Sequence, residues 1–95
     1  MNVVRLSARI EESKPLRYTP AGLPALDVWL AHQSTVEESG AKRQVNAALR
    51  AIAFGAVAER LSTQATGSEW LFQGFLVNWR RSKQVALHIQ DFQPN

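Results

Sequence analysis

The N-terminal part of the chain alternates between apolar and polar residues. From Val3 to Ile10 apolar side chains occupy every second position, and arginine or serine stands between them. A period of two places successive side chains on opposite faces of a strand, so this segment predicts a half-buried strand. Ala25–Gln33 alternates in the same way, with Leu26, Val28 and Leu30 on one side, and predicts a second strand.

Two segments without apolar periodicity flank the second predicted strand. Glu11–Pro24 contains three prolines and a glycine, residues that remove ladder donors and favour turns, so a loop is predicted there. Ser34–Lys42 is polar, includes Gly40 and two glutamates, and predicts a connecting loop.

The segment Gln44–Leu61 supports two interpretations. Its alanines favour a helix, and apolar residues such as Val45, Leu49 and Ile52 recur at helical spacing. Alternatively, every second residue from Val45 lies on one face of a strand that ends at Gly55, before a short helix from Ala56 to about Thr63. Periodicity alone leaves both interpretations open.

The C-terminal third predicts a β-hairpin. Glu69–Asn78 is rich in aromatic residues typical of strands, with Gly74 where a bend or bulge is expected. Val85–Phe92 alternates again, with Val85, Leu87 and Ile89 on one side, and Trp79–Gln84 forms the hairpin tip. Four or five short strands and one short helix predict an all-β fold, a small antiparallel barrel.

Length and composition narrow the class of protein. The chain has 95 residues, 45% hydrophobic and 20% charged, which predicts one folded domain over residues 1–95. The absence of cysteine excludes a disulfide framework, a thiolate zinc site and a cysteine nucleophile. Apolar runs fall far short of the ~20 residues of a membrane span, so no membrane association and a cytoplasmic location are expected. Eleven basic against eight acidic residues favour a polyanionic partner only weakly, because many basic surfaces bind nothing.

Residues for catalysis are sparse. His32 and His88 lie in separate strand patterns, with no serine or carboxylate at a spacing that composes a proton relay. Neither histidine has neighbours at metal-ligand spacing, and the glycines match no phosphate-binding loop. We therefore expect no enzyme, no metal and no cofactor.

The hairpin tip carries the strongest chemical signal. It places one indole among three cations, which suit the bases and the phosphates of a single nucleic-acid strand. The alternative is a charged, solvated tip with Trp79 folded back on the barrel rim. In the strand interpretations the same face extends to further residues, for which a solvated sheet face is the alternative: Arg5, Arg9, Trp29, Asn46 and Arg50.

Four short motifs point to a known family. In order along the chain they are Pro15-Leu16-Arg17 with Pro20-Ala21-Gly22-Leu23-Pro24; Leu30-Ala31-His32-Gln33-Ser34 with Glu37-Glu38; Lys42-Arg43-Gln44; and Gln73-Gly74-Phe75-Leu76 with the basic loop and Leu87-His88. In order, spacing and length the chain resembles the primosomal replication protein N (PriB) family, itself similar to single-stranded-DNA-binding proteins with an OB-fold.

The resemblance implies a five-stranded antiparallel OB-fold barrel with one short helix between strands three and four, and it favours a strand up to Gly55. It also implies a homodimer that binds single-stranded DNA and the restart helicase PriA, with DnaT as a further candidate partner. By position, the family's DNA contacts fall on Arg43 and on the basic loop. At two positions where the family has aromatic residues, this chain has Ala41 and Asn46. Trp79 is the candidate to replace the stacking that these positions lose.

The function expected from these observations is that of a single-stranded-DNA-binding accessory protein of the replication restart primosome, which helps to reassemble stalled forks. The first alternative is a protein-interaction module of the primosome with weak nucleic-acid binding, and the second is an RNA-binding module. The expected nucleic-acid-binding residues are Arg43, Asn46, Arg50, Trp79, Arg80, Arg81 and Lys83.

Overall fold

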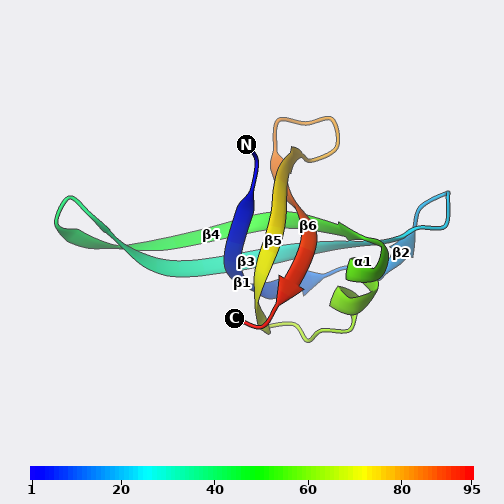
Figure 1. The fold of residues 1–95 in the computed structure, drawn as a ribbon, viewed down its shortest axis with the longest axis horizontal. Coiled ribbons are helices and arrows are strands. Elements are labelled where there is room, and N and C mark those ends of the chain that lie inside the picture. The colour runs from blue at the N-terminus through cyan, green and yellow to red at the C-terminus, as the bar shows by residue number, and fades with distance from the viewer.

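The computed structural model describes residues 1–95 and consists mainly of strands, with one short helix (Figure 1). In chain order the elements are β1 Val4–Ser13, β2 Arg17–Tyr18, β3 Pro24–Glu38, β4 Ala41–Phe54, α1 Gly55–Ser62, β5 Glu69–Asn78 and β6 Val85–Gln93. The sheet order is β1-β5-β6-β4-β3-β2, and a further pairing of β1 with β3 closes the barrel. The predicted closed barrel of five long strands is confirmed, and its arrangement is consistent with the OB-fold.

The prediction that all pairings are antiparallel is wrong at one place. β4 and β6 pair in parallel through Arg50–Ile52 and Ala86–His88, whereas every other pairing is antiparallel. A closed ring of five strands cannot alternate in direction throughout, because five is an odd number. One neighbouring pair must therefore point the same way.

The ambiguous segment after Gln44 is a strand followed by a helix. β4 continues to Phe54, and α1 begins at Gly55, between the third and fourth long strands as predicted. Continuous pairing with β3 outweighs the helix propensity of the alanines. Ala51 and Ala53 are fully buried, so small side chains fit where β4 faces the barrel interior.

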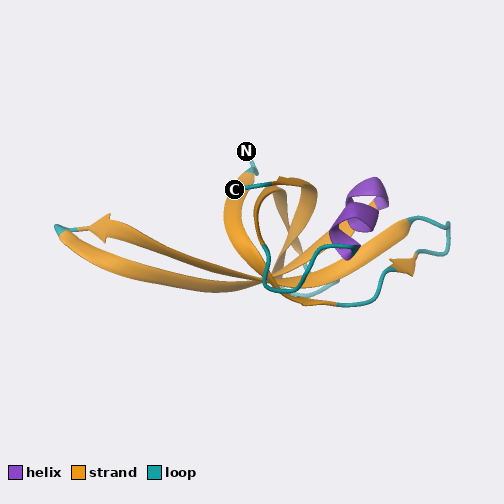
Figure 2. Ribbon diagram, turned by 90° about the horizontal axis from the view of Figure 1, so that it is seen from below, coloured by secondary structure: helices purple, strands orange, loops and turns teal.

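The prediction of a loop over Ser34–Lys42 is wrong. β3 and β4 continue through this segment as a long two-stranded ribbon that projects from the barrel (Figures 1 and 2). Ser39 and Gly40 form its two-residue turn, and both have positive φ angles, as type I′ hairpins require. Because the ribbon leaves the core, its residues face solvent on both sides and lack an apolar period.

The predicted loop over Glu11–Pro24 is also shorter than expected. β1 continues to Ser13, with a register shift between Ile10 and Glu12, and the short β2 pairs with the start of β3. A bulge of this kind bends an edge strand, which allows β1 to pair with β5 first and with β3 afterwards.

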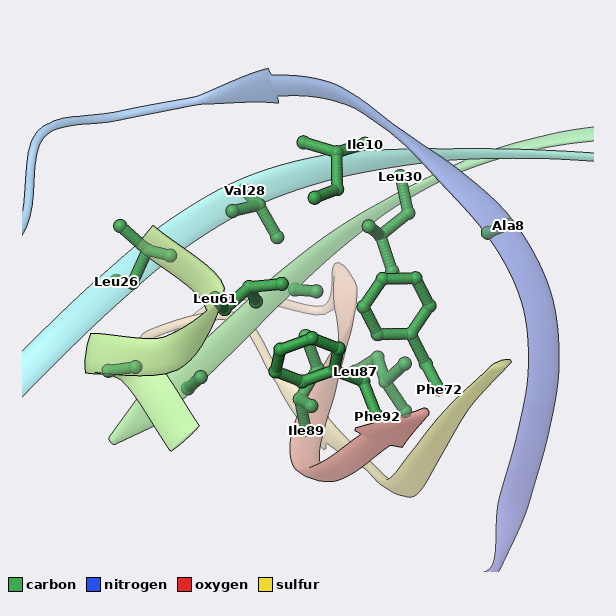
Figure 3. Packing of buried hydrophobic residues seen from close by; sticks show 13 residues of the cluster. Ala8, Ile10, Leu26, Val28, Leu30, Leu61, Phe72, Leu87, Ile89 and Phe92 are labelled. Carbon is green, nitrogen blue, oxygen red and sulfur yellow. The ribbon is translucent and has the colours of Figure 1, made fainter. Parts of the chain in front are cut away.

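The core lies inside the barrel and under α1 (Figure 3). Its largest fully buried side chains are Phe72, Ile10, Leu26, Leu30, Leu61, Leu87 and Ile89. The expected irregularity at Gly74 is confirmed, because the β5–β6 register shifts between Gln73 and Gly74. A Cβ at Gly74 would overlap the His88 carbonyl oxygen, so only glycine allows this approach.

The simple alternation predicted for the last strand is wrong at its start. Ala86 and Leu87 are both buried, whereas Val85 is exposed. Ala86 pairs with Arg50 of β4 on one side and with Val77 of β5 on the other, so neighbours cover it on the outer face as well.

Candidate nucleic-acid interface

The outer face of β3 and β4 forms a continuous track from the barrel onto the ribbon. Cross-strand partners line it in three successive rows: Trp29 with Arg50, Ala31 with Ala48, and Gln33 with Asn46. Rows two residues apart along a strand are separated by roughly 6.6 Å. The track therefore passes from an aromatic and cationic row over small side chains to a row of amides.

At the barrel end of this track, two indoles enclose one guanidinium. The Arg50 Cζ atom lies 4.4 Å from the ring centroid of Trp29 and 5.0 Å from that of Trp79. Arg80 lies over Trp79 as well, at 4.9 Å. Cation–π contacts of this kind hold the rings and the charges in one place. We call these four residues, Trp29, Arg50, Trp79 and Arg80, the Arg50 cluster.

The local structure of the hairpin tip presents Trp79 to Arg50. The Trp79 amide donates to the Gln84 carbonyl at 2.6 Å, and the Ser82 amide and hydroxyl both donate to the Trp79 carbonyl. Arg80 takes a positive φ of 54° in the turn. Trp79 is half-buried, so the indole lies against the barrel as well as among the cations.

An open hollow of about 290 Å³ lies beside the cluster. Phe54 and His88 line it together with Trp79 and Arg80. The imidazole of His88 stacks on Phe75 at 4.5 Å between ring centroids and approaches Phe54 at 5.4 Å. This part of the surface therefore combines aromatic walls with a cationic rim.

Arg17 contributes a fixed positive charge to the same hollow. Its Nε donates to an Asp27 carboxylate oxygen at 2.9 Å, and Nη2 donates to the other oxygen at 3.4 Å. The hydrogen bond to Asp27 raises the pKa of Arg17, with a smaller opposing effect of burial. The guanidinium stays charged throughout the physiological pH range.

The predicted binding residues do not all lie together. Arg50, Trp79 and Arg80 meet in the Arg50 cluster, and Arg81 and Lys83 are exposed in the same tip. Asn46 lies four residues from Arg50 along β4, roughly 13 Å away at strand spacing.

Arg43 lies farther out, close to the ribbon turn. Seven residues separate it from Arg50, roughly 23 Å at strand spacing, and by alternation it belongs to the opposite face of β4. There it forms an exposed ion pair with Glu38 at 3.7 Å.

Trp29 completes the Arg50 cluster. The sequence placed it on the possible extension of the hairpin-tip face but not among the seven expected binding residues. The signal that could have placed it is the Ser39-Gly40 dipeptide, which is typical of a tight turn. A two-residue turn there sets Trp29 opposite Arg50. The prediction of a loop over Ser34–Lys42 left the pairing of Trp29 with Arg50 unrecognised.

The two histidines have structural partners. One ring nitrogen of His32 bonds the Ser7 carbonyl at 2.6 Å, and the other bonds the Ser34 hydroxyl at 2.8 Å, which ties β3 to β1.

No group of three or more His, Asp or Glu side chains is placed to hold a metal ion. No helix is long and apolar enough to cross a membrane.

Comparisons with known proteins identify the family of this chain. Residues 2–91 match the model of a family described as another single-strand binding protein family. Replication restart protein PriB of Bordetella pertussis is 45% identical over 91 residues, which cover 95% of this chain and 85% of that protein. PriB of Neisseria gonorrhoeae is 41% identical, over 95% of this chain and 90% of that protein.

Solved structures resemble the whole fold. PriB from Ralstonia solanacearum superposes with a TM-score of 0.89 at 30% identity, covering 100% of this chain and 98% of that one. The single-stranded DNA binding protein from Thermus aquaticus gives 0.79 at 28% identity, covering 100% of this chain and 50% of that one. These are families of binding proteins and not of enzymes. The chain belongs to the replication restart PriB family, within the single-strand binding proteins.

Proposed function

We propose that this protein binds single-stranded DNA as an accessory protein of the replication restart primosome, and that it also binds the restart helicase PriA. In this role it helps to reassemble stalled replication forks in the cytoplasm, with DnaT as a further candidate partner. The names of its relatives support replication restart and single-strand binding.

The Arg50 cluster is the observation that carries DNA binding. A single strand offers phosphates and unstacked bases, and the cluster offers guanidinium groups beside indole faces. Arg81 and Lys83 extend the charge around the tip, and neither takes part in an ion pair of the protein. Such a surface binds the strand with little dependence on base sequence.

A fluorescence titration tests this function. Oligonucleotides of equal length, single-stranded and duplex, are added at two salt concentrations while indole emission is followed. We expect tighter binding to the single strand, quenching of the indoles, and affinity that falls with salt because bound cations release counterions. Absence of single-strand binding at the lower salt concentration would reject the proposal.

We also propose that the protein forms a homodimer through the first residues of β1. Pairing of β1 with β3 begins only at Arg9, so the earlier residues of β1 have a strand partner, β5, on one side alone. Val3 and Leu76 are exposed at the same end, where Asn2 bonds the backbone of Leu76. An open edge beside apolar side chains is suited to pairing with a second copy.

Light scattering at micromolar concentration tests the dimer. Wild type and Leu23→Glu, a matched change at the far end of the molecule, should both have the mass of a dimer. Val3→Glu should shift the mass toward a monomer, because it places charge at the proposed contact. A monomeric wild type would rule the dimer out.

A further inference from the structure

A second hollow, of about 250 Å³, lies on the outer track where the ribbon leaves the barrel. Ala31 and Ala48 face each other across β3 and β4 and form its floor. Because these side chains are single methyl groups, a planar ring can lie close to the backbone there. The hollow is one row away from Trp29 and Arg50, so a strand bound at the Arg50 cluster would pass over it.

The walls of this hollow carry hydrogen-bonding groups. Gln33 and Asn46 are cross-strand partners, and neither amide takes part in a side-chain hydrogen bond within the protein. Arg9 and Glu11 of β1 line the other side. The three ion pairs of the protein leave both of these charges free.

This set of groups matches the edge of one kind of base. Each side-chain amide offers two N–H donors and one carbonyl acceptor, and the Glu11 carboxylate is a pure acceptor. Cytosine and adenine carry an exocyclic amino group that donates two hydrogen bonds, whereas thymine presents a carbonyl there. A carboxylate favours the amino group and repels the carbonyl oxygen.

We propose that this hollow binds one base with an exocyclic amino group, read by Gln33, Asn46 and Glu11, while Arg9 holds the adjacent phosphate. The inference rests on the proposed single-stranded DNA binding and adds a base preference to it. Aromatic stacking at the Arg50 cluster tolerates every base, whereas the amides and the carboxylate select among bases.

Oligo-dC and oligo-dT of equal length provide the test, because both are pyrimidine strands that differ at this edge. Wild type should bind oligo-dC about fivefold more tightly, the lower end of what one bidentate base contact provides. Gln33→Met and Asn46→Val keep side-chain bulk but remove the amides, and Glu11→Gln removes the carboxylate that distinguishes the two bases. In the triple variant the dC:dT affinity ratio should fall toward one, while the salt slope stays unchanged because no cation is removed.

Gln44→Met is the matched control. Gln44 is an amide on the same face of β4, one row farther out and opposite Thr35, and it does not line the hollow. This variant should keep the wild-type ratio. Equal binding of dC and dT by wild type, or an unchanged ratio in the triple variant, would overturn the base preference alone. Failure of wild type to bind either oligonucleotide would instead reject the proposed function.

Discussion

The Arg50 guanidinium carbon lies 4.4 Å from the ring centroid of Trp29, its cross-strand partner, and 5.0 Å from that of Trp79. One cation thus connects an indole of β3 with an indole of the hairpin tip. A flat guanidinium can lie against two rings and still donate from its edge, whereas an ammonium group is a point charge.

The first prediction therefore separates the charge of Arg50 from its shape. Arg50→Lys should weaken single-stranded DNA binding severalfold while the slope of log affinity against log salt stays the same, because the charge remains. Arg50→Met should also flatten that slope by about 0.7, the change for one phosphate that is no longer neutralised. Titrations over a salt series measure both quantities. Full affinity in Arg50→Lys would show that the contact with the two rings is dispensable.

The three tip cations should act through phosphates. Replacing Arg80, Arg81 and Lys83 together by alanine should weaken binding to all single-stranded sequences about equally. The salt slope should flatten by about 0.7 for each phosphate that the variant no longer neutralises. The same titrations, with several oligonucleotide sequences, provide the measurement. Unchanged affinity would favour the alternative function, in which this tip contacts a protein.

Trp79 should act through stacking. Trp79→Ala should cost about 1–3 kcal/mol of binding free energy with little change in the salt slope, since an uncharged ring releases few ions. DNA should quench wild-type fluorescence more than that of the variant. The variant also serves as the reference for quenching of Trp29 and Trp70. Equal quenching in both proteins would place the bound strand away from the tip.

The ion pair near the ribbon turn predicts a gain in binding. Glu38 lies 3.7 Å from Arg43 and competes with any phosphate for that guanidinium. Glu38→Gln should strengthen single-stranded DNA binding and steepen the salt slope by up to about 0.7 if Arg43 then contacts a phosphate. Arg43→Ala combined with Glu38→Gln is the control, since the steeper slope should disappear. A slope that remains steep would assign the effect to overall charge.

Gly74 should be required for stability. Gly74→Ala would place a methyl group against the His88 carbonyl and force β5 from β6, so we expect a loss of more than about 2 kcal/mol. Gly22→Ala is the matched control, because Gly22 has a φ of +85° and open space around it. This change should cost only about 1–2 kcal/mol of backbone strain. Urea unfolding compares the two, and equal losses would mean that strand packing relaxes around the methyl group.

Local patterns determined the strands that face the core. Alternation over Val3–Ile10 and Ala25–Gln33, and the aromatic segment before Asn78, correspond to β1, β3 and β5, because a half-buried strand needs an apolar residue at every second position. The basic tip around Trp79 could also be recognised from the sequence, because its indole and its three cations are close together along the chain.

Tertiary structure alone decided the ribbon and the Arg50 cluster. The ribbon has no buried face, so its strands leave no apolar period, and only pairing across the Ser39-Gly40 turn sets Trp29 opposite Arg50. Trp79 is 29 residues farther along the chain from Arg50 and meets it because β6 pairs in parallel with β4 when the barrel closes. The Ser39-Gly40 dipeptide marks the turn that sets one register, but the contact between Arg50 and Trp79 depends on closure of the barrel, which no local sequence pattern encodes.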